Sequence, residues 1–158
     1  MEYLEIVNRV LKLLREDVVA TVADDDAVVQ LVATYVNDAK TQVENSFHFN
    51  ALRYDWKATV AADADNFLLT DSGRAPIVEE VWGPNGHMLR ELSDRDVRRL
   101  RRQNNVTTAT EPTYYAVDGA VGGELRIRIH PAPAAAYAVE VVGYKKQDDL
   151  VNNSDVLL

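Results

Sequence analysis

The sequence predicts an α+β fold: an N-terminal antiparallel helical hairpin followed by an antiparallel, sandwich-like β-sheet domain with one short helix. Apolar residues recur at helical spacing up to Phe47, and beyond Asn50 they alternate with polar residues, as strands require. A chain of 158 residues can bury a core without disulfides or metals. We therefore expect a helical hairpin in residues 1–50 and a β domain in residues 51–158, with the short helix at 94–103 and an exposed loop at 104–113.

Two helices are expected in the first 50 residues. The first covers residues 3–20, because its apolar side chains share one helical face: Tyr3, Ile6, Val7, Val10, Leu11, Leu13, Leu14 and Val18. The acidic run Asp24-Asp25-Asp26 interrupts this pattern and supplies carboxylates suited to the N-cap of a second helix, which continues to Phe47. The apolar faces of the two helices must be covered by each other, by the rest of the chain or by neighbouring subunits.

Short strands and turns alternate after residue 50. Trp56, Ala58 and Val60 alternate with polar neighbours, and Ser93 with Asp96 forms a variant of the capping box at the start of the short helix. The expected strands lie at residues 56–60, 66–70, 77–82, 88–91 and 114–117, and the expected turns at 71–73, 83–86, 118–119 and 122–123.

The last third of the chain predicts a β-hairpin from Glu124 to Leu150. Its first arm alternates apolar Leu125, Ile127 and Ile129 with Arg126, Arg128 and His130, and its second arm begins at Tyr137. Pro131 and Pro133 bound the connection, because proline has no amide hydrogen for a central ladder. We expect an antiparallel pair with one polar face open to solvent or a partner, and prolines that prevent pairing with a wrong strand.

Composition narrows the classes of protein that remain. The chain has no cysteine, which excludes disulfides, thiolate nucleophiles and zinc–thiolate sites. Its formal charge of −8 repels DNA and anionic lipid on average, so nucleic acid is not the leading partner. No apolar run approaches the roughly 18 residues of a membrane span, and we expect no membrane partner.

Candidate catalytic and metal-binding residues form no constellation. The histidines His48, His87 and His130 lie far apart in sequence, and we interpret them as surface or interface residues. The glycine-rich segments 83–86 and 119–123 lack the Lys-Ser/Thr of a phosphate loop, and Asp24-Asp25-Asp26 lacks the alternating ligands of a calcium loop. We predict no catalytic, cofactor-binding or metal-binding residue and therefore no enzyme.

One group of charges is unusual for an acidic chain. It comprises Arg90 and the arginines of the short helix, Arg95, Arg98, Arg99, Arg101 and Arg102. One interpretation is a solvated helix face with internal charge pairs, and a second is a docking patch for an acidic neighbouring subunit. Direct DNA binding is the remaining interpretation. The candidate interface residues are Arg95, Arg98, Arg99, Arg101, Arg102, Lys145 and Lys146.

The order of the expected elements and of three sequence segments is similar to that of a known protein family. A helical hairpin, a Trp-containing first strand and a short helix precede the segments Glu111-Pro112-Thr113-Tyr114-Tyr115, Leu125-Arg126-Ile127-Arg128-Ile129-His130-Pro131-Ala132-Pro133 and Tyr144-Lys145-Lys146-Gln147-Asp148-Asp149-Leu150. This order resembles that of the head-to-tail adaptor, or connector, proteins of tailed bacteriophages.

The resemblance implies a structural subunit without a cofactor. Such a subunit forms a ring, usually of twelve copies, that joins the portal protein to the downstream tail or nozzle protein and lets DNA pass with transient, non-specific contact. The resemblance also implies a place in the virion neck after assembly in the host cytoplasm.

Two other hypotheses stay open from the sequence. The chain has the acidic, cysteine-free profile of other virion or tail-completion proteins as well. A small hydrolase or carbohydrate-binding β module would use Trp56, Trp82, Tyr114 and Tyr115 as an aromatic platform, although aromatic residues at alternating strand positions are more often core.

Overall fold

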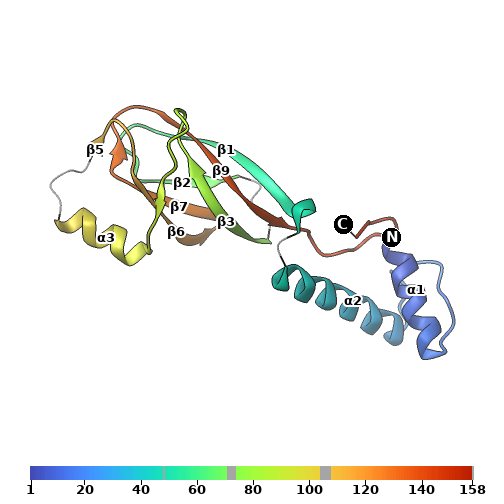
Figure 1. Ribbon diagram of the computed structural model, residues 1–158. Coiled ribbons are helices and arrows are strands. Elements are labelled where there is room, and N and C mark those ends of the chain that lie inside the picture. Colours follow the sequence, from blue (N-terminus) through green and yellow to red (C-terminus); the bar gives the residue numbers. More distant parts are fainter. Residues whose placement is uncertain (48, 71–73, 104–107, 158) are drawn as a thin grey trace. The chain divides into compact units, whose positions relative to one another are not determined.

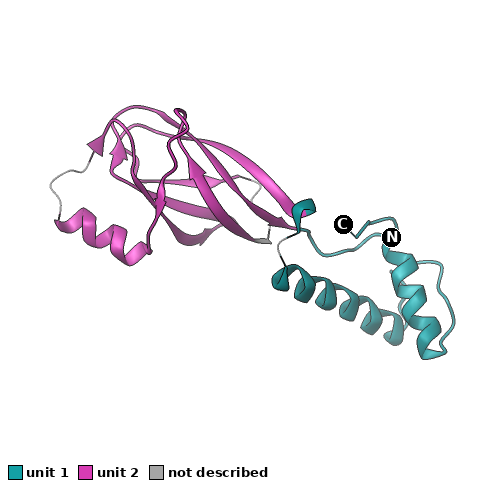
Figure 2. Ribbon diagram, viewed as in Figure 1, with its two compact units in different colours: residues 1–51, 147–158 teal, residues 52–146 magenta. Residues whose placement is uncertain are grey.

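The computed structural model describes residues 1–47, 49–70, 74–103 and 108–157, and the chain forms two compact units (Figures 1 and 2). The helical unit contains residues 1–51 and 147–158, and the sheet unit contains residues 52–146. The expected division at residue 50 had placed residues 147–158 with the strands. His48, the turn expected at 71–73 and residues 104–107 of the expected loop lie outside the described residues.

The helical unit is built on α1 (Tyr3–Leu14) and α2 (Ala27–Ser46). Tyr3, Val7 and Leu11 form its core together with Val22, Val29, Val32 and Leu150. The Asp26 side chain accepts a hydrogen bond from the Val28 amide, which confirms the predicted N-cap of α2.

The first helix is shorter than the sequence predicts. It ends at Leu14 rather than at residue 20, because Arg15 takes a left-handed conformation and its amide bonds back to the Leu11 and Lys12 carbonyls. Val18 continues the helical spacing by chance and is exposed. The Asn8 side chain then holds the returning chain through the Val19 backbone at 2.8 and 2.9 Å.

The C-terminal segment of residues 147–158 is fixed to α2 by two polar side chains. Asn37 accepts from the Leu150 amide at 2.8 Å and donates to the Leu150 carbonyl at 3.0 Å. Lys40 donates to the Gln147 carbonyl at 2.8 Å and lies 3.5 Å from Glu44, and both of these charged side chains are buried. A charged pair at these positions is therefore part of the interior of the helical unit.

The sheet unit contains two main sheets, shown in Figure 1. A three-stranded antiparallel sheet has the order β1 (Arg53–Val60), β9 (Tyr137–Lys146), β3 (Arg74–Trp82). The second has the order β2 (Asn66–Leu69), β7 (Glu124–His130), β6 (Tyr114–Val121), β4 (Arg90–Glu91), with β4 parallel to β6. A 3-10 turn, η1 (Asn50–Leu52), precedes β1, and the third helix, α3 (Asp94–Gln103), has the predicted bounds.

The core of the sheet unit lies between these two sheets. Trp56, Val60, Val81, Val139 and Val141 come from the first sheet, and Phe67, Leu69, Tyr115, Leu125, Ile127 and Ile129 come from the second. Buried residues from both sheets in one cluster confirm the sandwich-like arrangement within an α+β fold.

The predicted hairpin from Glu124 to Leu150 is wrong. Its two arms, β7 and β9, belong to different sheets: β7 pairs with β2 and β6, and β9 pairs with β1 and β3. The true hairpin is β6–β7, which turns at Gly122 and Gly123. The connection after His130 carries the chain from one sheet to the other, and alternation alone did not reveal this crossing.

Two smaller predictions around the hairpin also fail. Asp118 and Gly119 do not form a turn but lie inside β6, where the register shifts between Val117 and Gly119. The expected loop at 104–113 contains a short strand, β5 (Thr108–Ala109), which pairs in parallel with β8 (Ala132–Pro133). The proline segment thus pairs with another strand instead of preventing pairing.

Candidate functional site

Helix α3 packs on the second sheet, on the face opposite the sandwich core. The Ser93 hydroxyl accepts from the Asp96 amide at 3.1 Å and donates to the Asp96 carboxylate at 2.6 Å, so Ser93 caps α3 as predicted. The side chain of Val97, in the first half of α3, is buried. Asp94 and Asp96 lie in the first turn of α3 and Arg101 and Arg102 in its last turn, as the helix dipole favours.

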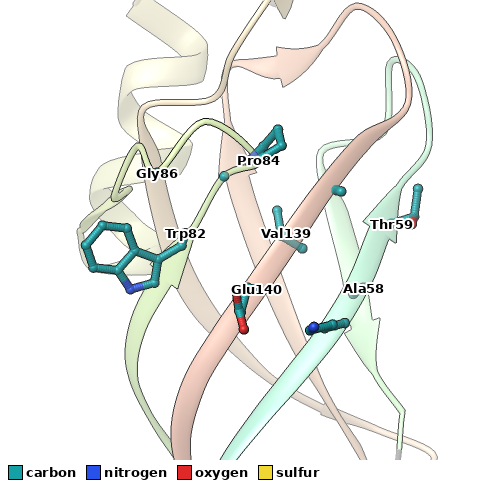
Figure 3. A pocket seen from close by; sticks show the side chains of 10 residues that line it. Ala58, Thr59, Trp82, Pro84, Gly86, Val139 and Glu140 are labelled. Atoms are coloured by element: carbon teal, nitrogen blue, oxygen red, sulfur yellow. The ribbon is translucent and has the colours of Figure 1, made fainter.

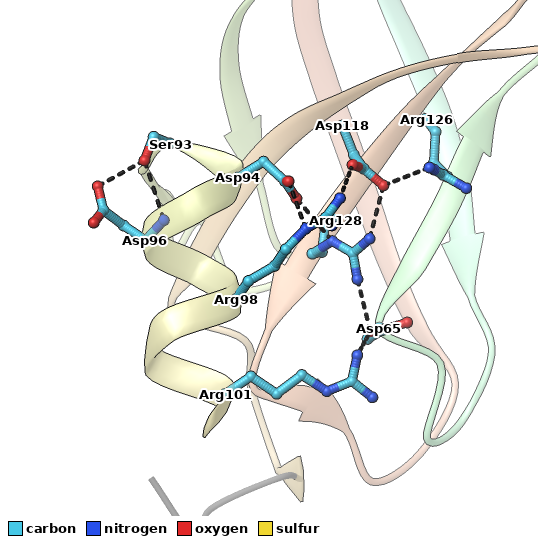
Figure 4. A network of polar contacts seen from close by, with 9 residues as sticks. All are labelled: Asp65, Ser93, Asp94, Asp96, Arg98, Arg101, Asp118, Arg126 and Arg128. Carbon is cyan, nitrogen blue, oxygen red and sulfur yellow. Dashed lines mark hydrogen bonds and ion pairs between the residues drawn. The ribbon is translucent and has the colours of Figure 1, made fainter. Parts of the chain in front are cut away.

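A polar network joins α3 to the strands below it (Figure 4). Its centre is Asp118 on β6, whose carboxylate is 4% exposed and receives Arg98 at 2.9 Å, Arg126 at 2.7 Å and Arg128 at 2.7 Å. Arg128, on β7, also binds Asp94 and Asp65 at 3.1 Å each. Arg101 binds Asp65 from the last turn of α3. The network therefore connects α3, β6, β7 and the turn before β2.

The charges of the network stabilise one another. Burial raises the pKa of the Asp118 carboxyl, but hydrogen bonds from Arg128 and Arg98 outweigh burial, and the pKa is lowered overall. Burial lowers the pKa of Arg128, and the hydrogen bond and charge of Asp118 reverse that effect and raise it. Both groups remain ionised at neutral pH.

The candidate interface residues fall into three places. Arg98 and Arg101 belong to the network. Arg95, Arg99 and Arg102, at spacing i, i+4, i+7, are exposed on another face of α3, and we call them the arginine stripe. Lys145 and Lys146 lie at the end of β9, away from α3, where the Lys145 ammonium is 5.5 Å from the Tyr54 ring centre (Figure 1).

The whole chain, residues 1–158, matches the SU10 adaptor protein family. The chain belongs to this family. The match agrees with the resemblance to phage head-to-tail adaptors, so the chain is a phage adaptor protein and a component of the virion neck. No curated protein matches it significantly.

The residues of the adaptor that sequence reasoning missed are the carboxylates of the network. Asp65 lies in a turn before β2, and Asp118 lies in β6, where the sequence predicts a turn. A signal existed in the alternation of β7, because Arg126 and Arg128 on one sheet face require carboxylate partners once a helix covers that face. The sequence does not show which carboxylates these are.

The two described histidines of the adaptor differ in burial, and only one of them lies at the surface. His130 is buried, and burial together with the charge of Arg101 lowers its pKa, whereas His87 is exposed. Among the described residues, no group of three or more His, Asp or Glu side chains is placed to hold a metal ion.

Two of the four aromatic residues that a carbohydrate-binding platform would use are buried. Trp56 and Tyr115 are buried in the sandwich core. Trp82 lines an open hollow of about 480 Å³ over β1 and β9, beside the turn at Gly83 and Pro84 (Figure 3). Its indole N–H donates to Glu80 at 2.9 Å.

No helix in the described ranges combines the length and the apolar character that crossing a bilayer requires.

Proposed function

We propose that the adaptor forms a closed ring of twelve copies that joins the portal protein to the downstream tail or nozzle protein and lets DNA pass through its centre. The family match supports this proposal at the level of a phage adaptor. The ring, its copy number, its two neighbours, its assembly in the host cytoplasm and the passage of DNA are the parts that experiments must test.

The outer face of α2 is the observation that carries the proposal. Its exposed apolar side chains are Val28, Leu31, Tyr35 and Val43, followed by Phe47 just after the helix. Tyr35 is 63% exposed. Surfaces of this kind and length mark sites of protein association.

The same face is nearly free of charge. Asp38 is the one exposed charged residue of α2, because Lys40 and Glu44 are buried. Depletion of charge is typical of the centre of a protein interface. We assign this face to the portal protein, with which the adaptor would bury the apolar side chains.

The charge of the adaptor fits a passage for DNA. Its formal charge of −8 disfavours tight binding of the phosphate backbone. DNA that moves through a ring of such subunits would make only transient, non-specific contacts. We assign the exposed Arg95, Arg99 and Arg102 and the half-buried Lys145 and Lys146 to contacts with neighbouring subunits of the neck rather than to DNA.

The experiment combines the adaptor with the portal protein of the same phage. Sedimentation velocity and negative-stain microscopy should show rings on portal particles. The double variant L31S/Y35S should bind portal at least about tenfold more weakly, because it removes two apolar contacts. The control R9Q/K12Q changes two exposed polar residues of α1, outside this face, and should bind like wild type.

A wild-type adaptor that stays monomeric and has no affinity for portal would overturn the proposal. Portal binding that L31S/Y35S leaves unchanged would remove α2 from the contact while leaving the ring intact. Neither variant touches the core of the helical unit, so circular dichroism should show native helix content in both.

A further inference from the structure

The arginines of α3 have two different roles. Arg98 and Arg101 are bound by aspartates of the network (Figure 4). In the arginine stripe, Arg99 lies 3.8 Å from Asp96 and is 67% exposed, and neither Arg95 nor Arg102 contacts a carboxylate within the described part of the chain. The stripe is therefore a basic surface that the sheet unit does not neutralise.

Negative charge is divided unevenly between the two units. The helical unit holds twelve Asp or Glu residues against four Lys or Arg, so the whole formal charge of −8 lies there. The sheet unit holds thirteen of each kind and is neutral. An acidic surface that could bind the arginine stripe is thus present on every copy of the adaptor itself.

The segment between α1 and α2 is where this acidic charge is densest. Residues 15–26 include Glu16, Asp17, Asp24, Asp25 and Asp26, and we call this segment the acidic turn. Asp24 and Asp26 accept backbone amides at the start of α2. Glu16, Asp17 and Asp25 are exposed, and their side chains make no hydrogen bond or ion pair within the described residues.

Apolar side chains lie within and beside the same segment. Leu13 is 80% exposed, and Leu14 and Val18 are more than half exposed. An apolar centre with a charged rim is the usual anatomy of a protein interface. The aliphatic stems of arginine side chains can cover such an apolar centre while the guanidinium groups reach the surrounding carboxylates.

We propose that the arginine stripe of one adaptor binds the acidic turn of the next adaptor in the ring. The contact joins two different surfaces, so it is head-to-tail and can continue from copy to copy until a ring closes. The inference rests on the proposed ring. A protein partner is favoured over DNA because DNA would leave the acidic turn and the leucines beside it, Leu13 and Leu14, without a partner.

Two charge-reversal variants test this contact. R95E/R99E/R102E reverses the stripe without changing the network, and E16R/D17R/D25R reverses the turn without changing the caps of α2. Each variant alone places like charges in every contact between copies, so its association should weaken by at least about tenfold. Sedimentation velocity and native mass spectrometry would measure this, with portal present if wild type assembles only on portal.

The decisive sample is an equimolar mixture of the two variants. Each contact in the mixture can again join opposite charges, in rings where the two variants alternate. Assembly should return to within about threefold of wild type. Both variants have a negative net charge, so attraction between whole molecules does not explain such a rescue. A portal or DNA contact would not be restored by mixing.

The control R9E/R53E/R90E makes the same change in net charge outside the stripe and should assemble like wild type. If the glutamate variant of the stripe fails to fold, R95Q/R99Q/R102Q replaces it, with a smaller expected loss of association.

Wild-type assembly by the stripe variant, or no rescue in the mixture, overturns the contact but not the ring. Wild-type protein that forms no ring even on portal would contradict the proposed function itself. If the stripe variant assembles normally but loses affinity for DNA in fluorescence anisotropy, the stripe is a DNA contact and the inference is wrong.

Discussion

Three arginines converge on the Asp118 carboxylate, which is almost completely removed from solvent. Two of them, Arg126 and Arg128, come from the neighbouring strand, and Arg98 comes from α3. A carboxylate that joins two elements in this way determines where the helix sits on the sheet. Each partly buried arginine needs a hydrogen-bond acceptor, so the network stabilises the fold only when all of its acceptors are present.

The substitution Asp118→Asn should destabilise the sheet unit by about 2 kcal/mol, because it leaves partly buried arginines without their shared counter-charge. Urea unfolding followed by tryptophan fluorescence would measure the loss. The control Asp55→Asn removes an exposed carboxylate of β1 and should change stability by less than about 0.5 kcal/mol. A loss no greater than that of the control would show that the network contributes little.

The same residue gives a dependence on pH. The pKa of Asp118 is lower in the folded protein than in the unfolded chain, so its contribution is fully present above the unfolded pKa of about 4. The contribution is lost as the pH falls through the lower folded value. The difference in stability between wild type and Asp118→Asn should therefore shrink below pH 4. A difference that stays constant across that range would contradict this account.

At the scale of elements, the C-terminal segment is bound by α2 through the amide side chain of Asn37. Asn37→Ala should destabilise this attachment by about 2 kcal/mol, because the Leu150 amide and carbonyl both lose their partner. Hydrogen exchange at Leu150 should become about tenfold faster or more. The exposed residue Gln42 provides the control Gln42→Ala, which should leave exchange unchanged. Equal exchange in both variants would rule out this role for Asn37.

Local chemistry explains which elements the sequence predicts well. The bounds of α3 follow from Ser93 and Asp96 at its start, and the start of α2 follows from Asp26, since capping depends on residues close in sequence. The end of α1 was missed because Val18 continued the apolar spacing although Arg15 had already ended the helix. One apolar residue at helical spacing therefore does not show whether the helix continues to that residue.

Pairing between strands is a long-range property that alternation does not encode. Ile127 and Val139 both alternate as strand residues should, yet they belong to opposite sheets of the sandwich. The candidate site was limited in the same way. The arginines of α3 were visible in the sequence, but their division into bound and free sets depends on Asp65 and Asp118, which lie 36 and 20 residues from Arg101 and Arg98.

At the scale of the whole molecule, each unit has a hydrophobic cluster of its own. The cluster of the sheet unit uses only residues between Trp56 and Val141. A fragment of residues 52–146 should therefore fold alone, with a β-type circular dichroism spectrum and a cooperative unfolding transition. A fragment without either property would show that the sheet unit depends on the helical unit.

The pairing of β1 with β9 brings together the two points where the chain enters and leaves the sheet unit, since Arg53 lies opposite Tyr144. In topological terms, the sheet unit is a continuous segment between Ala51 and Gln147, both of which belong to the helical unit. Recombination at two neighbouring points can exchange such a segment without separating α1 and α2 from the C-terminal segment that completes their core. A lineage of adaptors could in this way renew one set of contacts while it inherits the other unchanged.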